Sequence, residues 1–432
     1  MTHTIYTLAE IADLNQSSIR HEDDLQNIQY LDTGSIIENQ IIEISTIPVA
    51  EAPSRARRKV KQNTIVYSTV RPRLRHYGIL MNPPCNLIVS TGFITIDIKE
   101  EYKNKVDARY LFLMLTRPEI TEHIACKADS AASAYPSINP SDIMELKFKI
   151  PNIKVQTELA NIWNSLDLKI ELNRQINDNL EAMAKQLYDY WFVQFDFPNE
   201  EGKPYKSSGG AMVWNEKLKR EIPQGWNDCK IKDFMRIFTG KKDVSKAMPG
   251  NYKFFSCAPE PISSNEYLYD GYAVLVSGNG SYTGRVGFYK GKFDLYQRTY
   301  ACVLDEDEHN ISFFYYTLRY LFQPIYSGGK HGSSIPYIVL GDLADFRFAF
   351  NETICTKFVD AAKPMFDEQL LRQKEIEVLT KQRDELLPLL MNGQASVNYH
   401  LYVFPRTHFI LFLSPQKYKT MNDLKRKGVY WF

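Results

Sequence analysis

Two kinds of hydrophobic pattern alternate along the chain. Short runs rich in Val, Ile, Tyr and Phe, such as IVYSTV, LIVSTGFITIDI and TYACVL, are broken by Gly, Pro, Asn and Asp in residues 1–152 and 198–351. Such runs predict strands, so both regions are expected to be mostly β domains with a few helices. Residues 153–197 and 352–397 instead carry apolar residues at spacings of three and four, which predict two long helices.

The apolar positions of these helices define the expected buried seams. The first seam comprises Leu159, Ile162, Leu166, Ile176, Leu180, Met183, Leu187 and Tyr190, interrupted at Lys169 and Asn173. The second comprises Val359, Ala362, Phe366, Ile376, Leu387 and Leu390, with Gln369 and Gln373 at the matching polar positions. A pseudo-twofold relation would pack the helices antiparallel, as a spacer of roughly 50 to 60 Å.

The two β-rich regions repeat one plan. AYPSINPSDIMELKFKIP (134–151) aligns with SIPYIVLGDLADFRFAFN (334–351) at an offset of 200, and VYSTVRPRLRHYGIL aligns with LVSGNGSYTGRVGFY at an offset of 209. Further upstream, LAEI (8–11) aligns with IKDF (231–234). The predicted fold class is therefore α+β: two homologous, mostly β domains separated by two long antiparallel coiled-coil helices, with a pseudo-twofold internal repeat.

Composition changes this picture little. The 52 Lys and Arg residues nearly balance 51 Asp and Glu residues, so a nucleic-acid surface would have to be a local patch. The six cysteines form no C-x-x-C and no metal-like pairing with the eight histidines, which fits a reducing cytoplasm and predicts no metal site. No apolar run is long enough for a membrane span or a secretion leader, so no membrane partner is expected.

Catalytic motifs are incomplete. Asn82-Pro83-Pro84-Cys85 is similar to the N-P-P-aromatic motif of DNA amino-methyltransferases, but Cys85 replaces the aromatic ring and no glycine turn for S-adenosylmethionine follows a strand. A Pro-Pro turn is the favoured interpretation. Phosphate-loop, zinc-protease, serine-hydrolase and nuclease signatures are absent from the sequence.

Local basic clusters are the stronger signal, because Arg and Lys contact phosphates while Arg, Asn, Ser and Thr also contact base edges. The expected DNA-contacting residues of the first copy are Arg55, Arg57, Arg58, Lys61, Arg71, Arg73, Arg75 and His76. Those of the second copy are Thr239, Lys241, Lys242, Asn279, Tyr282, Arg285, Lys330, His331, Ser333 and Ser334. One charged run alone is more often a solvated face, so the interpretation depends on the recurrence of clusters in equivalent strands and loops.

Apolar residues in excess of what a two-helix seam can bury are candidates for a partner interface. They are Leu187, Tyr188, Trp191 and Phe192 in the first helix and Leu386, Leu387, Leu389 and Leu390 in the second. The alternative is that they pack against the chain's own domains.

Several segments together resemble the specificity (S) subunit of type I restriction-modification enzymes over residues 1 to 397. They are RRKVKQNTIVYSTVRPRLRHYGI, IPNIKVQTELANIWNSLDLKIELNRQINDNLEAMAKQLYDYWF, IPQGWNDCKIKDF, LVSGNGSYTGRVGFYKGKFDLYQRTYACV and KQRDELLPLLMNGQASV. The tail, residues 398–432, departs from the family pattern.

This resemblance implies two target-recognition domains that each bind one half of a split, asymmetric DNA sequence. It also implies that two modification (methyltransferase) subunits dock on the helices and that restriction (endonuclease/translocase) subunits join the complex. S-adenosylmethionine, ATP and Mg²⁺ would then belong to those partners, and the chain itself would not be a catalyst. Arg71, Arg73, Arg75 and His76 differ from their counterparts in the second copy, as expected where two domains meet different half-sites.

Two other classes of function remain open at this point. A free-standing DNA methyltransferase or nuclease would modify or cut DNA as the purified chain. A coiled-coil scaffold for protein partners would fail to shift DNA at low salt, even with a modification subunit present.

Overall fold

The computed structural model describes residues 3–20, 23–130, 136–305, 308–332, 334–391, 395–397 and 411–413. Two compact units make up the chain. Unit 1 comprises residues 1–169 and 379–432, and unit 2 comprises residues 170–378. Most of the predicted tail, 398–432, lies outside the described residues. Its described part is β24 (Leu411–Leu413), which pairs antiparallel with β23 (Ala395–Val397).

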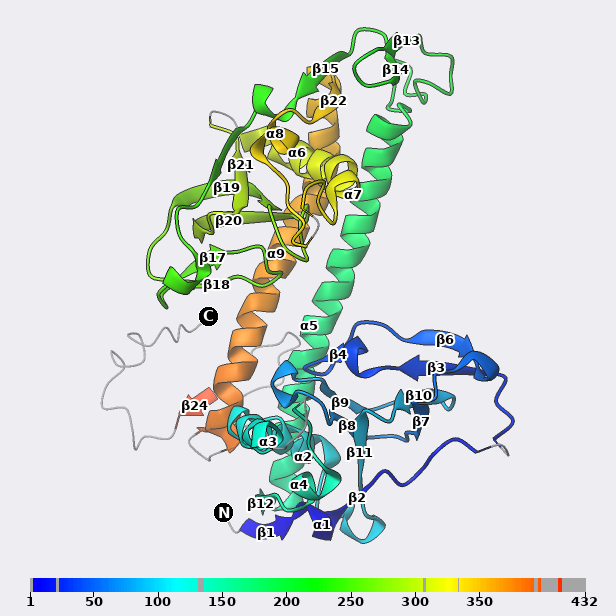
Figure 1. The fold of residues 1–432 in the computed structure, drawn as a ribbon, viewed down its shortest axis with the longest axis vertical. Helices are drawn as coiled ribbons and strands as arrows, with labels where there is room; N and C mark the ends of the chain where they lie inside the picture. The colour runs from blue at the N-terminus through cyan, green and yellow to red at the C-terminus, as the bar shows by residue number, and fades with distance from the viewer. Residues whose placement is uncertain are drawn as a thin grey trace. The chain divides into compact units, whose positions relative to one another are not determined.

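Unit 1 contains two four-stranded sheets (Figure 1). The first has the order β2-β11-β8-β9, with the bounds Ala12–Leu14, Phe93–Ile98, Thr64–Ser68 and Tyr77–Leu80. The second has the order β6-β3-β10-β7, with the bounds Ser45–Pro48, Asn27–Leu31, Leu87–Ser90 and Ala56–Lys59. Val66 and Phe93 of the first sheet pack on Leu31 and Val89 of the second. Both faces of β8 are therefore covered, which explains its unbroken hydrophobic run.

Helices cover the other face of the first sheet. They are α2 (Ala108–Leu115), α3 (Pro118–Ser130) and the start of α5 (Ile153–Tyr188). Ile65 and Tyr67 point from β8 into this layer, where they join Leu111 of α2 and Trp163 of α5 in one buried cluster. Alternate residues of β8 thus contribute to different cores, as the period of a strand requires.

Unit 2 contains one six-stranded sheet of order β16-β21-β19-β20-β17-β18 (Figure 1). The bounds are Arg236–Thr239, Thr299–Val303, Tyr269–Ser277, Val286–Leu295, Tyr252–Phe255 and Ile262–Ser264. A helical layer made of α6 (Ile311–Thr317), a π-helical turn (Leu318–Phe322) and α7 (Gln323–Tyr326) packs on Val274 and Val276 of β19. A separate hairpin joins β13 (Met212–Asn215) to β14 (Arg220–Pro223).

The internal repeat is confirmed at the level of strand pairing. The order β2-β11-β8-β9 in unit 1 matches the order β16-β21-β19-β20 in unit 2. Val66 lies opposite Gly78 in the first pair of strands, and Leu275 lies opposite Gly287 in the second, which is the predicted offset of 209. The two sheets therefore repeat one arrangement, residue for residue, along these strands.

The outer strands and short helices repeat as well. β1 (His3–Thr7) pairs antiparallel with β12 (Lys147–Pro151), and β15 (Asn227–Lys230) pairs in the same way with β22 (Arg347–Phe350). Before each outer strand lies a short helix, α4 (Pro140–Met144) or α8 (Leu340–Ala344). Asp142 accepts a hydrogen bond from Asn139 N (2.8 Å), and Asp342 accepts one from Val339 N (2.9 Å), so each carboxylate caps its helix.

The two long helices run antiparallel, as predicted. α5 continues into a π-helical turn (Asp189–Val193), and the second long helix is α9 (Glu352–Met391). Within unit 2, Arg372 Nη1 donates to Asn173 Oδ1 (3.4 Å) and Gln369 Nε2 donates to Asn177 O (3.5 Å). Residue numbers rise along one helix as they fall along the other. Within unit 1, Arg383 Nη1 donates to Asp167 Oδ1 (3.2 Å).

The predicted seam of α5 is wrong by about one residue in its second half. Met183 is 54% exposed and Tyr190 is 37% exposed, whereas Ala184 and Trp191 are buried. The physical cause is the aromatic core of unit 2, which draws Trp191 and its neighbours inward. The seam of α9 is as predicted at Val359, Ala362, Phe366 and Ile376, all of which are buried.

Candidate nucleic-acid interface

In each unit, two of the segments selected from sequence are held together by the same pair of backbone hydrogen bonds. In unit 1, Ile138 N donates to Thr69 O (2.9 Å) and Arg71 N donates to Pro136 O (2.9 Å). In unit 2, Ile338 N donates to Gly278 O (2.9 Å) and Gly280 N donates to Pro336 O (3.0 Å). The loops 69–76 and 278–285 thus occupy equivalent places beside 136–138 and 336–338.

The backbone of these two loops bends at the same positions. Arg71 and Arg75 have φ values of 48° and 56°, and their counterparts Gly280 and Gly284 have values of 80° and 81°. The left-handed region suits glycine but costs an L-residue with a side chain about 1 to 2 kcal/mol. Because non-glycine residues held in this region cluster at functional sites, the two arginines favour a binding role for this loop.

Replacing Arg71 with glycine should relieve strain in the backbone of this loop. We expect Arg71→Gly to raise the free energy of unfolding of unit 1 by up to about 1 kcal/mol, because glycine relieves the left-handed backbone at some cost in chain entropy. The measurement is urea denaturation of the purified chain. Arg57→Gly is the matched control: Arg57 lies in the extended strand β7, so glycine there should lower stability. A lower stability for Arg71→Gly would contradict the assigned strain.

The remaining basic residues of unit 1 are tied into the domain to different degrees. Arg73 donates to Glu122 through Nε (3.1 Å) and Nη2 (2.7 Å) and to Asp129 through Nη1 (2.6 Å), and these hydrogen bonds raise the pKa of its guanidinium. Arg73 therefore anchors the 3-10 turn Pro72–Leu74 to α3. Arg75 forms an ion pair with Glu38, and His76 Nδ1 lies 2.7 Å from Ile36 O.

The basic residues between positions 55 and 61 also differ in exposure and in how they are bonded to the rest of the domain. Arg55 and Arg57 are exposed, and Arg57 Nε donates to Ser54 O (3.2 Å). Arg58 is half-buried and donates to Thr91 O (3.3 Å), and burial lowers the pKa of its guanidinium. Lys61 is exposed and lies 3.7 Å from Asp97. Arg55 and Arg57 are the side chains of this cluster best placed to meet phosphate.

Unit 2 brings its predicted residues together on what we call the loop face: residues 239–242, 278–285, 297–298, 330–332 and 334–338. Arg285 Nη2 donates to Ala258 O (2.6 Å) and its guanidinium lies 5.7 Å from the Tyr282 ring. The His331 ring stacks on Tyr337 and lies 3.1 Å from the Asp342 carboxylate. Backbone bridges join Asn279 and His331 to the same residue, Tyr337.

The lysines and hydroxyl residues of the loop face differ in exposure. Lys242 bridges Asp294 (2.9 Å) and Glu266; burial lowers the pKa of its ammonium group, but these two carboxylates outweigh that effect and raise it. Lys241 and Ser334 are exposed, and Thr239 is half-buried. Lys330 Nζ lies 4.2 Å from the centre of the Tyr326 ring. Ser333 lies outside the described residues.

Sequence patterns missed two residues of the loop face, Gln297 and Arg298. They form the turn between β20 and β21, where Gln297 N donates to Lys242 O (3.0 Å) and Gly278 N donates to Arg298 O (2.9 Å). These bonds place the turn between two loops that had been selected from sequence. The only sequence signal for these two residues was a polar pair, QR, between two strand-like runs. Such polar pairs are common in turns and do not indicate a binding role.

Three of the expected partner contacts are wrong, because unit 2 buries them. Tyr188, Trp191 and Phe192 are 1%, 7% and 3% exposed and belong to its aromatic core. Tyr188 also donates a hydrogen bond to Thr317 Oγ1 (2.9 Å). Leu187 packs partly buried at the edge of the same core. Leu386, Leu387, Leu389 and Leu390 belong to α9, but their side chains lie outside the described part of the structure.

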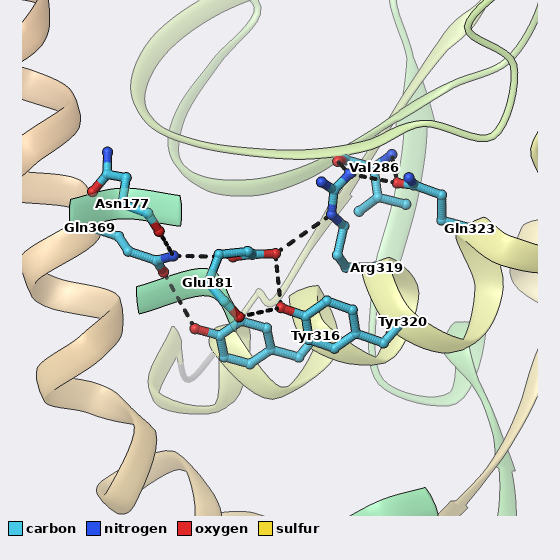
Figure 2. A network of polar contacts seen from close by, with 8 residues as sticks. All are labelled: Asn177, Glu181, Val286, Tyr316, Arg319, Tyr320, Gln323 and Gln369. Atoms are coloured by element: carbon cyan, nitrogen blue, oxygen red, sulfur yellow. Dashed lines mark hydrogen bonds and ion pairs between the residues drawn. The ribbon is translucent and has the colours of Figure 1, made fainter. Parts of the chain in front are cut away.

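A polar network attaches the helical layer of unit 2 to both long helices (Figure 2). Glu181 of α5 accepts hydrogen bonds from Tyr320 Oη (2.8 Å) and from Gln369 Nε2 of α9 (3.1 Å), and it lies 3.6 Å from Arg319 Nε. Arg319 in turn donates to Gln323 Oε1 (2.8 Å) and Val286 O (3.1 Å). One carboxylate thus joins α5, α9 and the helical layer, which fixes the register of the helices in this unit.

Among the residues that the structure describes, no group of three or more His, Cys, Asp and Glu side chains is arranged to hold a metal ion. The same residues contain no helix with the length and apolarity needed to cross a membrane. Asn82–Cys85 links β9 to β10 as a turn, with Cys85 exposed.

Comparisons with known proteins agree with the repeated fold. The family model described as the type I restriction modification DNA specificity domain matches residues 4–182 and 223–350, together more than half of the chain. The HindI specificity subunit of Haemophilus influenzae is 35% identical over 39% of this chain, and the match spans 36% of that relative's length. The MjaIX specificity subunit of Methanocaldococcus jannaschii is 26% identical over 76% of this chain and 77% of its own length.

A solved structure shares the fold. The S subunit of a type I restriction-modification system from M. genitalium superposes with a TM-score of 0.55 at 16% identity, over 90% of this chain and 96% of that one. The repeated strand order, the paired loops and the two family-model matches lead to one conclusion: the chain belongs to the type I restriction modification DNA specificity family.

Proposed function

We propose that the chain is the DNA sequence-recognition subunit of a type I restriction-modification complex and binds a bipartite, asymmetric target. The observation that carries this proposal is the pair of equivalent loop frames with different side chains. Where unit 1 has Arg71 and Arg75, unit 2 has Gly280 and Gly284 on the same backbone. Recognition of two different half-sites requires one loop backbone that carries two different sets of side chains. The side chains that contact bases give sequence specificity, whereas the backbone only positions them.

Exposure and ion pairing indicate which of these residues contact phosphates, which support the loops and which contact bases. Arg55, Arg57 and Lys241 are exposed and extend from the surface, so they neutralise phosphates. Arg73 and Lys242 are each held by two carboxylates and stiffen the loops that carry the other residues. Asn279 and His331 are joined to Tyr337 by backbone bridges, and Tyr282 of the same loop face is exposed, so these three residues are assigned to contact with base edges.

The chain acts with partners in this proposal. Two modification subunits dock on α5 and α9 and methylate adenine, and restriction subunits translocate and cut DNA. S-adenosylmethionine, ATP and Mg²⁺ belong to these subunits. The names of the H. influenzae and M. jannaschii relatives, specificity subunits of type I restriction enzymes, support this assignment.

Methylation mapping tests the proposal. The chain is co-expressed with the modification subunit encoded beside it, and N6-methyladenine is located in the genomic DNA of the expression strain by long-read sequencing. A two-part motif with a fixed gap is expected. A continuous palindrome, or methylation by the purified chain alone, would overturn the proposal. Failure of the complex to shift DNA at low salt would instead favour the protein scaffold.

The salt dependence of binding separates phosphate contacts from loop anchors. Lys241→Ala should reduce the magnitude of the negative slope of log K against log salt by about one, because one phosphate contact is lost. Arg73→Ala should change the slope less, because Glu122 and Asp129 already neutralise this guanidinium. The slopes are measured by fluorescence anisotropy with a duplex containing the mapped motif. A larger change for Arg73→Ala than for Lys241→Ala would reverse the two roles.

A further inference from the structure

The β20–β21 turn of unit 2 presents two polar side chains on a fixed backbone. Gln297 and Arg298 are both exposed. The turn is held by Gln297 N to Lys242 O (3.0 Å), by Gly278 N to Arg298 O (2.9 Å) and by Thr299 N to Tyr296 O (3.0 Å). Recognition side chains need this combination, because a rigid support keeps their polar groups at one position.

Arg298 differs from other arginines of unit 2. Arg236 pairs with Asp305, Arg319 lies beside Glu181, and Arg285 donates to Ala258 O. Among the residues that the structure describes, no carboxylate or carbonyl accepts a hydrogen bond from the Arg298 guanidinium. Its donors are therefore available to a ligand from outside the chain, in the planar arrangement that suits two adjacent acceptors.

A surface hollow of about 440 Å³ lies beside this turn. Phe238, Tyr300 and Leu340 supply its apolar wall, while Thr239, Gln297 and Arg298 supply polar groups. Gly278 allows its loop to lie directly against the turn, because a Cβ at this position would lie only 2.2 Å from Arg298 O. An amide and a guanidinium that line the same hollow as two aromatic side chains match the edge and face of a nucleobase. Arginine binds guanine O6 and N7 in the major groove, and glutamine binds adenine N6 and N7.

Unit 1 lacks this feature at the equivalent place. Thr69 N donates to Gly92 O (2.9 Å), the counterpart of the bond from Gly278 N to Arg298 O, so Gly92 occupies the position of Arg298. A Cβ on Gly92 would lie 2.8 Å from Thr33 Cγ2, which leaves no room for a side chain unless Thr33 shifts. At these equivalent positions, unit 1 has Arg71, Arg75 and Gly92 where unit 2 has Gly280, Gly284 and Arg298.

We propose that Arg298 and Gln297 determine part of the half-site bound by unit 2, with Arg298 binding a guanine and Gln297 an adenine through the major groove. This inference rests on the function proposed above. It adds the side chains that set the second half of the target and the bases that they select.

The test compares three variants in complex with the modification subunit, using methylation mapping of the expression strain's genomic DNA. Arg298→Ala should relax one position in one half of the motif and leave the other half and the gap unchanged. Arg298→Lys should keep the salt slope but not restore the base preference, because an ammonium group cannot make the two parallel bonds. Arg236→Ala, on β16 and paired with Asp305, is the control and should leave the motif unchanged.

Binding to duplexes with single base-pair changes completes the test. At the relaxed position, Arg298→Ala should reduce discrimination about ten- to a hundredfold. An unchanged motif would overturn the inference and leave the proposed function standing. The same holds for an equal loss of affinity for all duplexes, accompanied by a salt slope smaller in magnitude by about one. Loss of all methylation by both Arg298 variants, with the protein folded, would also overturn it. A wild-type complex without a two-part motif would overturn the proposed function itself.

Discussion

Tyr188→Ala should lower the free energy of unfolding of unit 2 by about 3 to 5 kcal/mol, the range for removing a large aromatic side chain from a packed core. The Tyr188 ring is 1% exposed and contacts Phe192, Phe313, Tyr320 and Phe358 at centroid distances of 5.1 to 6.2 Å. The loss is a large part of the stability of a domain of this size. It is measured by urea denaturation followed by tryptophan fluorescence.

Two controls separate packing from the other contributions of this residue. Tyr188→Phe keeps the ring but removes the hydrogen bond to Thr317, so it should cost only about 1 to 2 kcal/mol. Met183→Ala, on the exposed side of α5, should change stability by less than about 0.5 kcal/mol. Similar losses for Met183→Ala and Tyr188→Ala would restore the seam expected from the heptad pattern and contradict the observed register.

Gly278→Ala should abolish recognition by unit 2 while unit 1 stays folded. Its Cβ would lie 2.2 Å from Arg298 O and 3.0 Å from Tyr300 Cε2, and a backbone oxygen cannot move aside as a flexible side chain can. The loop 278–285 must then separate from the β20–β21 turn, which breaks the bond from Gly278 N to Arg298 O. We expect a cost of about 2 to 3 kcal/mol and loss of methylation at the mapped motif.

Gly287→Ala is the matched control for this prediction. Gly287 lies in β20, close along the chain, and a Cβ there would meet nothing within 4 Å. The motif should be methylated as in the wild type, with stability unchanged or slightly raised. Normal methylation by Gly278→Ala would show that the close contact between these loops is not needed for recognition.

Much of the fold was predictable because its signals are local or repeated. The strands came from short hydrophobic runs, and the helices came from spacings of three and four. The offsets of 200 and 209 linked Asp142 to Asp342 and Gly78 to Gly287, and the structure pairs these residues equivalently. A repeat is informative because each copy tests the interpretation of the other.

The candidate site was only partly predictable, because composition does not show which charges are already paired. Arg73 and Arg71 looked alike in sequence. In the folded chain Arg73 bonds to Glu122 and Asp129, 49 and 56 residues away, and becomes an anchor for the loop. Lys242 is bound in the same way by Asp294 and Glu266. Arg298 was missed for the opposite reason, since a lone polar turn carries no pattern.

The sequence by itself determined the α+β class, the two copies of one plan, the antiparallel long helices and the equivalence of loops in the two copies, because these depend on local periodicity and on internal alignment. Only the tertiary structure decided which face of α5 is buried, which basic side chains are neutralised, and where Gln297 and Arg298 lie. Those outcomes depend on contacts between residues far apart in the chain, which form only when the sheets and helices pack and exclude water from between them.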